Sequence, residues 1–502
     1  MHVPRLADPP LLDARRRLAD RTAARIDADG RLAAPCRSRV LETSLALRLL
    51  DLTGHTRERE HLARFLSGIP QAGLVSKLDL VLAECALTGA PLPDAIIGSA
   101  LAGFDHFTAG RKRNLLHAIA TVFGGPSADL AVQPHDSGTL HPWASTVATA
   151  SEVIITGHAT PRQREELLAA LAHPGVWDGH LLCHLLAAHA VRRLDGTEEV
   201  VAGAVRHLLA TRRPDGGIPF IESLDVFCSA LAGLGLVTTG HEQVRAIGDR
   251  LAGLQDPHGG WAYATGVRQS DVDTTSVVLE LLTAVDPVRY AGQIAGGSAY
   301  LHDIRGADGG FPTYLRGGTS EVAMTAAAAN AIKLDAVGQE VLRGAVSFIA
   351  GRQRPDGTFE PGWSRSTANT LCRVLLAMNR ADMALRAGEH VAIHTAIARA
   401  EHRLARDQND DGGWGHVPGE PSDPISTSFA LIGLARHSHG HRAVSDGLRH
   451  LLSCQRADGG YVSRPDSTGP RGFLYDVPVL ADLYPLLALS HVAAAVPVLR
   501  AG

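Results

Sequence analysis

The chain has 502 residues, of which 45% are hydrophobic and 20% charged, so it can bury large cores and form two or three domains. Its formal net charge of −4 gives no electrostatic basis for binding nucleic acid. It has no run of about 18 apolar residues, no apolar signal core and no CxxC pair among its cysteines, so we expect a cytoplasmic protein with reduced thiols and no membrane span.

One local pattern recurs along the chain: a helix, an Asp-Gly turn, an aromatic or other apolar residue, and another helix. A weak first copy lies at 27–32, and six clearer copies follow at 213–220, 255–261, 307–311, 353–359, 408–414 and 455–461. A spacing of roughly 45 to 55 residues is typical of stacked supersecondary units. Apolar residues between the copies follow helical spacing, and strand signals are nearly absent. We therefore predict an all-α protein of antiparallel helix pairs, either an open solenoid or closed α/α barrels, and favour closure.

The second clear turn is followed by an unusual pair of acids, Asp271 and Asp273, with Thr274 and Thr275 directly after them and an apolar helix beyond. Burial and a neighbouring carboxylate both disfavour the charged form of a carboxyl group. An acid pair at a helix entrance beside an apolar interior can therefore keep one carboxyl protonated near neutral pH and direct it at an apolar substrate. The simpler interpretation is that one acid only caps the helix.

The repeated turns together with the Asp-Val-Asp-Thr-Thr box resemble the class II terpene cyclases, including copalyl-type diterpene cyclases and, more distantly, squalene–hopene cyclases. The family's box is Asp-x-Asp-Asp, with an Asp-x-Asp-Thr-Thr variant in some bacterial members. The resemblance extends from about residue 25 to 490. It implies a βγ architecture of two α/α barrels, with residues 1–25 as the N-terminal segment of the β domain, 26–240 as an inserted γ domain and 241–502 as the rest of β.

The resemblance also implies an activity. Asp273 is expected to be the proton donor and Asp271 its partner, and Thr274 stands where many members have a third aspartate. The reaction is protonation of the terminal alkene of a linear prenyl diphosphate, farnesyl or geranylgeranyl. Cyclisation then gives a bicyclic drimane- or labdane-type diphosphate, as in drimenyl or copalyl diphosphate synthases. The chain has no room for a third, ionising domain and no Asp-Asp-x-x-Asp motif, so a phosphatase or class I cyclase is expected to act downstream.

A carbocation needs electron-rich walls, which aromatic rings supply through cation–π attraction. The candidates are Trp363, Trp261, Phe311, Tyr314 and Trp414. Trp261 and Trp414 lie inside the repeated turns, where packing is the simpler role, whereas Trp363 lies beyond its turn. Aromatic residues make up only 5% of the chain, which suggests a modest cavity and slightly favours the C15 substrate.

The substrate diphosphate needs cations. In the family a basic residue of the γ domain precedes a helix, and Arg113 or Lys112 resembles it, with Arg268 as a second site. Mg²⁺ is expected to bind with the diphosphate, and Asp225 and Glu222 are the candidate ligands. A surface or capping role is the competing interpretation for both acids.

Two other classes of protein remain open at this stage. A prenyltransferase β-like subunit has the same α/α barrel but needs a zinc site made of Asp, Cys and His, and no matching cysteine spacing is present. A non-enzymatic helical-repeat scaffold explains the repeats but not the paired acids at a buried helix entrance.

Overall fold

The computed structural model describes residues 9–69, 76–102, 104, 106–125, 132–133, 140–385, 390–435 and 441–499. These residues form 21 α-helices, α1 to α21, and only isolated β-bridges in place of strands, which confirms the all-α prediction. Residue contacts divide the chain into two compact units, Met1–Ala34 with Leu224–Gly502, and Pro35–Ser223. No helix in the described part of the chain has the length and apolarity that a bilayer crossing requires.

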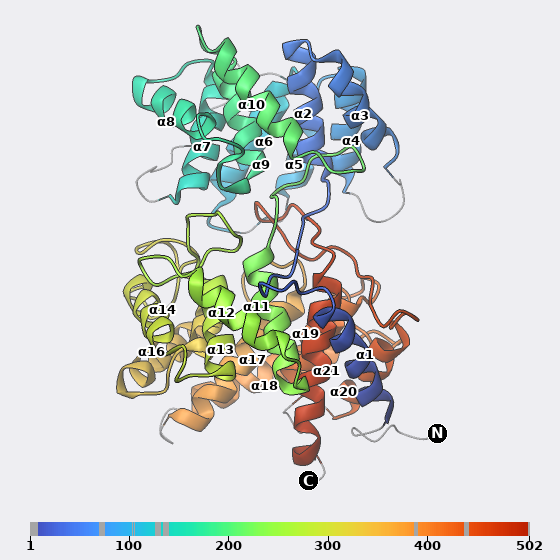
Figure 1. Cartoon of the computed structure of the whole chain (residues 1–502), viewed down its shortest axis with the longest axis vertical. Helices are drawn as coiled ribbons and strands as arrows, with labels where there is room; N and C mark the ends of the chain where they lie inside the picture. Colours follow the sequence, from blue (N-terminus) through green and yellow to red (C-terminus); the bar gives the residue numbers. More distant parts are fainter. Residues whose placement is uncertain are drawn as a thin grey trace. The chain divides into compact units, whose positions relative to one another are not determined.

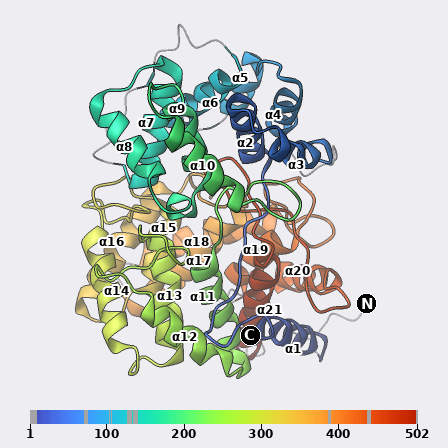
Figure 2. The ribbon, with the colours of Figure 1, turned by 45° about the horizontal axis from the view of Figure 1, so that its top comes forward.

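The first unit is a closed ring of helix pairs (Figure 1, Figure 2). Its inner helices, each packed on the next, are α11 (Asp225–Leu236), α13 (Val272–Val285), α15 (Val322–Ala331), α17 (Thr367–Ala384), α19 (Pro424–Leu434) and α21 (Leu480–Leu499). The last inner helix packs on the first, which closes the ring. The outer helices, each packed on one or two inner helices, are α12 (Gln243–Gly253), α14 (Ala291–Ile304), α16 (Ala336–Arg352), α18 (His390–Arg406), α20 (His441–Ser453) and α1 (Pro9–Ala23). The expected α/α barrel is thus confirmed, and its sixth outer helix comes from the opposite end of the chain.

The aromatic residue of the repeated turn locks an outer helix to the inner helix that follows. The backbone N–H of Trp261 donates to Thr275 Oγ1 at 3.0 Å, and its indole Nε1 donates to the carbonyl of Leu251 at 2.6 Å. Trp414 makes the same two bonds with the corresponding threonine and carbonyl, at 3.0 and 2.8 Å. Gly259, two residues before Trp261, has a φ of 92°, a left-handed conformation that glycine adopts without strain.

The second unit is a smaller all-helical barrel. Helices α2 (Val40–Thr53), α6 (Ala109–Val122), α7 (Pro142–Thr156) and α9 (Leu181–Val191) contact one another in a ring. The helices that pack around this ring are α3 (Thr56–Ser67), α4 (Lys77–Thr88), α5 (Asp94–Leu101), α8 (Pro161–Leu171) and α10 (Glu198–Ala210). Leucine, alanine and isoleucine side chains from the ring fill its interior.

The unit boundaries differ from those expected from the sequence. They lie after residues 34 and 223, whereas the sequence analysis placed them after 25 and 240. The physical reason for the second shift is that α11 supplies one wall of the first barrel, where it packs on α13 and α21. The identification of the two units with the β and γ domains of the family stays a prediction.

Candidate active site

A cavity lies inside the ring of inner helices of the first unit. Its apolar wall includes Phe227, Leu231, Leu376, Phe429, Ile432 and Leu487, and its polar side chains include Asp273, Glu280, Asn330, Asn369, Arg373 and Tyr484. All six inner helices contribute to the lining. The site is therefore an apolar chamber with a few polar groups, the usual composition of a pocket for an apolar ligand.

Asp271 is the sequestered acid of the pair. It caps α13, because its Oδ1 accepts a hydrogen bond from the backbone N–H of Thr274 at 2.7 Å. Only 4% of the residue is exposed, and Oδ2 is buried without a hydrogen-bond partner in the described part of the chain. Burial, reinforced by the charge of Asp273, raises the pKa of Asp271 to about 7. This carboxyl therefore keeps its proton up to neutral pH.

Asp273 is the acid that faces the cavity. Its side chain is 20% exposed and lines the chamber in the first turn of α13. The guanidinium of Arg373 on α17 grips both of its oxygens: Nη2 donates to Oδ2 at 3.0 Å, and Nη1 makes a shorter contact with Oδ1. Such a two-point contact fixes the position and orientation of the side chain. Asp273 is thus the acid of the box that lines the chamber, whereas Asp271 is the acid that keeps its proton.

A comparison within the barrel separates structural from functional acids. The N-cap residues of α13, α15 and α19 are Asp271, Glu321 and Asp423, and each backbone N–H donates to the carbonyl of the turn aromatic at 2.9 or 3.0 Å. An acid at this cap thus recurs in three of the inner helices, whereas α17 has Ser366 there. Two residues further on, the equivalents of Asp273 are Ala323 and Ile425. The second acid of the box is thus peculiar to α13.

Glu280 is a further acid in the chamber that the sequence analysis missed. It lies two turns beyond Asp273 on the same face of α13. Burial raises the pKa of Glu280 to about 7, although the positive charges of Arg373 and Arg380 act to lower it. The signal that could have revealed both Glu280 and Arg373 is a lone charged residue within an otherwise apolar helical segment, because such a residue needs a buried partner or a function.

Residues 319–494 match the family model for the squalene-hopene cyclase C-terminal domain. The drimenyl diphosphate synthase of Streptantibioticus cattleyicolor is 42% identical over 504 residues, which cover 96% of this chain and 94% of that protein. The drimenyl diphosphate synthase of Streptomyces showdoensis is 40% identical over 509 residues, with the same coverage. The chain belongs to the class II terpene cyclases. This full-length similarity confirms the resemblance and sets aside both the prenyltransferase-like and the scaffold alternatives.

The fold agrees with that assignment. The ent-copalyl diphosphate synthase from Streptomyces platensis superposes with a TM-score of 0.59 and 18% sequence identity, covering 97% of this chain and 99% of that one. At this identity the match speaks for the fold alone, and it places the cyclase among proteins of α/α-barrel architecture.

The expected aromatic wall of the cyclase is only partly supported. Trp261 and Phe311 are fully buried, and Trp414 is 2% exposed. Phe311 donates its backbone N–H to Thr325 Oγ1 at 2.9 Å, the bond that Trp261 and Trp414 make in their own turns. None of the three is among the residues that line the described cavity. The positions of Trp261 and Phe311 in the repeated turns favour a packing role, and their predicted contact with substrate stays a prediction.

Trp363 and Tyr314 belong to a buried polar network next to α15. The indole Nε1 of Trp363 donates to Thr313 Oγ1 at 3.0 Å, and that hydroxyl donates to Glu321 Oε1 at 2.7 Å. Arg471 forms an ion pair with Glu321 and places its guanidinium 4.1 Å from the centre of the Trp363 ring. Tyr314 meets Trp363 edge to face at 5.9 Å between ring centres. One face of Trp363 therefore already carries a cation, and its predicted contact with substrate stays a prediction.

The predicted basic residues differ in their surroundings. Lys112 is buried on α6, with its Nζ 3.8 Å from the centre of the Phe104 ring, and burial lowers its pKa to about 8. Arg113, the next residue on the same helix, is exposed. Arg268 is exposed in the first unit, between the turn and the acid box. Arg113 and Arg268 are thus accessible to an anion, whereas Lys112 is committed to the interior of its unit.

Asp225 does not suit the metal role that the sequence analysis gave it. Its Oδ2 accepts from Arg31 Nε at 2.8 Å and from Thr265 Oγ1 at 2.7 Å, and Arg250 lies 3.7 Å away. Its Oδ1 accepts from the backbone N–H of Thr265 at 2.9 Å. Glu222 is exposed and lies in the other unit. The carboxylate of Asp225 is already paired with arginines and ties the start of α11 to neighbouring loops, which argues against the predicted metal role.

Proposed function

We propose that this cyclase converts farnesyl diphosphate to drimenyl diphosphate. The observation that carries the proposal is the full-length similarity to two proteins named drimenyl diphosphate synthase, combined with an apolar chamber that holds one acid absent from the equivalent positions of α15 and α19. A proton adds to the terminal alkene and leaves a tertiary carbocation. Two internal alkenes close two rings, and loss of one proton restores a double bond. The product is an isomer of the substrate and keeps its diphosphate.

Asp273 is the group that delivers the proton in this proposal, because it is the box acid that lines the chamber. Asp271 holds a proton at neutral pH and returns one to Asp273 after each turnover. This division of labour amends the expectation that a single residue, Asp273, is both sequestered and reactive.

Arg373 favours proton transfer to the substrate through its positive charge. Proton transfer turns the donor into a carboxylate, and the two-point contact with Arg373 stabilises that product of the transfer. The guanidinium also holds the carboxylate close to α17, which limits its capture of the carbocation. A preorganised charge of this kind acts mainly on the transition state rather than on binding of the substrate.

The chamber protects the carbocation. Leucine, isoleucine and phenylalanine side chains from four of the inner helices exclude water and offer no nucleophile. Excluding water from the site prevents premature quenching of the cation, so that ring closure outruns the addition of water.

The diphosphate is assigned to one of two exposed basic residues, Arg113 of the second unit or Arg268 of the first, with Mg²⁺ as its counterion. Mg²⁺ binds mainly through phosphate oxygens and retained waters, and therefore needs few protein ligands. The carboxylate of Asp225 does not fit as such a ligand, because protein partners occupy both of its oxygens. A cytoplasmic location and a downstream phosphatase or class I cyclase belong to the same proposal.

The test is incubation of the purified protein with farnesyl or geranylgeranyl diphosphate and Mg²⁺, followed by phosphatase treatment and mass spectrometry. We expect a bicyclic C15 alcohol from farnesyl diphosphate, formed only when phosphatase is added. Conversion of the C20 substrate alone would overturn the choice of substrate. A product released without phosphatase would overturn retention of the diphosphate.

A further inference from the structure

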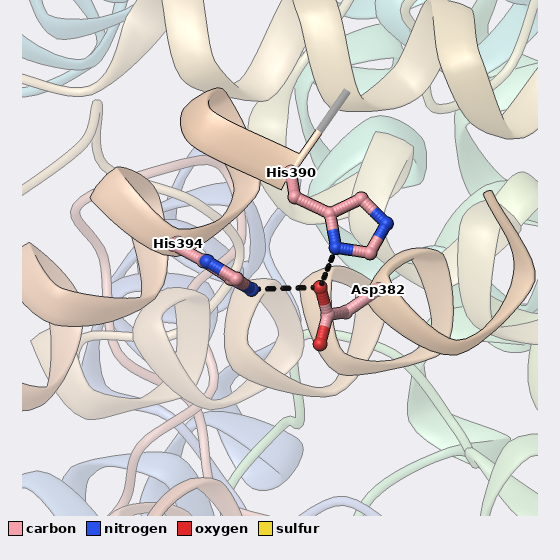
Figure 3. A group of neighbouring side chains, drawn as sticks. All are labelled: Asp382, His390 and His394. Carbon is pink, nitrogen blue, oxygen red and sulfur yellow. Dashed lines mark hydrogen bonds and ion pairs between the residues drawn. The ribbon is translucent and has the colours of Figure 1, made fainter. Parts of the chain in front are cut away.

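Three side chains with metal-binding atoms converge where α17 ends and α18 begins. Asp382 lies in the last turn of α17, and His390 and His394 lie one turn apart at the start of α18. Asp382 Oδ1 is 3.0 Å from His390 Nδ1 and 2.8 Å from His394 Nε2, and the three ligand atoms lie within 4.8 Å of one another. Figure 3 shows both imidazole rings directed at the same carboxylate oxygen.

A hydrogen bond orients the ring of His390 toward the carboxylate of Asp382. Its Nε2 lies 3.2 Å from the backbone carbonyl of Leu385, and a carbonyl can only accept, so Nε2 carries the proton. The other ring nitrogen, Nδ1, then faces Asp382 Oδ1 at 3.0 Å. The bond to Leu385 also fixes the ring, as the outer hydrogen bonds of metal-binding histidines do.

The spacing suits a divalent cation of the zinc class. Ligand atoms about 2.1 Å from a shared ion stand about 3.0 Å apart at a right angle and about 3.4 Å apart in a tetrahedral site. The two measured separations, 2.8 and 3.0 Å, are close to the right-angle value. Two imidazoles and one carboxylate favour Zn²⁺, Ni²⁺ or Co²⁺ over Mg²⁺, which prefers oxygen ligands. His394 is the most exposed of the three and leaves the site open to solvent.

We propose that Asp382, His390 and His394 form a binding site for one Zn²⁺ ion, which clamps α17 to α18. The site is separate from the reaction: Asp382 follows Arg373 by nine residues on α17, about 13 Å along the helix axis. The bound ion joins an inner helix of the barrel to its outer partner. Its effect is therefore on the stability of the barrel and not on proton transfer.

The experiment is calorimetric titration of the untagged, metal-free, full-length protein with ZnCl₂, together with thermal unfolding with and without Zn²⁺. We expect one ion per chain with micromolar affinity, and a rise of the unfolding temperature, because a ligand that binds only the folded state stabilises it. His394→Ala should weaken binding at least tenfold and abolish the rise. The matched control is His402→Ala, an exposed histidine on the same helix outside the cluster, which should bind as the unchanged protein does.

Two results would overturn the proposal. One is the absence of Zn²⁺ binding at 0.1 mM, a concentration of about 100 times the expected dissociation constant. The other is equal binding by the unchanged protein and by His394→Ala and Asp382→Asn, which would assign the ion to another site. Cyclase activity should be the same in both variants, so a failure of the zinc site leaves the proposed reaction untouched, and the reverse also holds.

Discussion

The first turns of α13, α15 and α19 share one backbone arrangement but differ in the side chains that they carry. Each begins with an acid hydrogen-bonded to the turn before it. Glu321 is paired with Arg471, whereas Oδ2 of Asp271 and Oδ2 of Asp423 are both buried without a hydrogen-bond partner in the described structure. His416 Nε2 lies 3.7 Å from Asp423 Oδ2. The caps of α13 and α19 are therefore alike in this respect, and the feature that separates the entrance of α13 is the second acid, Asp273.

The same comparison shows where the reactive group was added. The position two residues after the cap is alanine in α15 and isoleucine in α19, and it is Asp273 only in α13. A capping role accounts for the first acid of the box but not for the second. The comparison therefore predicts that a variant of Asp273 loses activity, whereas a variant of a cap acid in another repeat keeps most of it.

The largest effect is expected from Asp273→Asn, which removes the cavity-facing proton donor. Cyclisation should fall by about a thousandfold or more, at the upper end of what loss of a general acid does. The measurement is the rate of formation of the cyclic diphosphate from farnesyl diphosphate. Asp423→Asn, the cap variant of α19, is the control and should keep most of the activity. Equal losses in both variants would remove the functional distinction between the repeats.

Trp261→Ala and Trp414→Ala should each lower the free energy of unfolding by about 3–5 kcal/mol, the usual result of deleting a large buried aromatic side chain. The reason is that both rings fill equivalent places in the repeated turn. Urea unfolding followed by circular dichroism measures the loss. If Trp261→Ala lost activity at unchanged stability, a role for Trp261 in the carbocation wall would be restored.

Arg373→Met should lower kcat by about a hundredfold and change KM much less, because its charge acts on the carboxylate formed in the transition state. Breaking a buried ion pair also destabilises, so the assay belongs at a temperature where the variant is shown to be folded. Arg352→Met, an exposed arginine on α16, is the matched control. A change confined to KM would assign Arg373 to substrate binding instead.

Asp271→Asn should alter how stability depends on pH. The pKa of Asp271 is about 7 in the folded chain against 3.8 for the ordinary side chain, so between these values the unfolded chain releases a proton that the folded chain keeps. Its contribution is full below pH 3.8 and is lost as the pH rises through 7. Unfolding titrations at pH 5 and 7 should show the unchanged protein losing about 2 kcal/mol more than the variant.

Asparagine at position 271 still caps the helix, so the difference between the two proteins reports the ionisation and not the cap. The contribution of Glu280 is present in both proteins and cancels. Parallel pH profiles for the variant and the unchanged protein would show that Asp271 is charged in the folded state.

The sequence was sufficient for the repeats, the barrel and the position of the acid box. These features depend on local patterns: turn glycines, helical periodicity and a carboxylate beside an apolar segment. Arg373 escaped notice because it lies 100 residues from its partner Asp273, and no local pattern connects them. The ion pair of Asp225 with Arg31 escaped notice for the same reason, since the two residues are 194 positions apart in the sequence.

Sequence alone establishes that this chain is built of helix pairs and carries two acids at one helix entrance, because periodicity and adjacency are properties of the linear order. It does not establish which acid is charged. That depends on burial and on cations brought close by folding, and both act through distances that exist only once the ring of helices has closed. The assignment of Asp271 as the protonated carboxyl and Asp273 as the one that faces the chamber is thus a result of the tertiary structure.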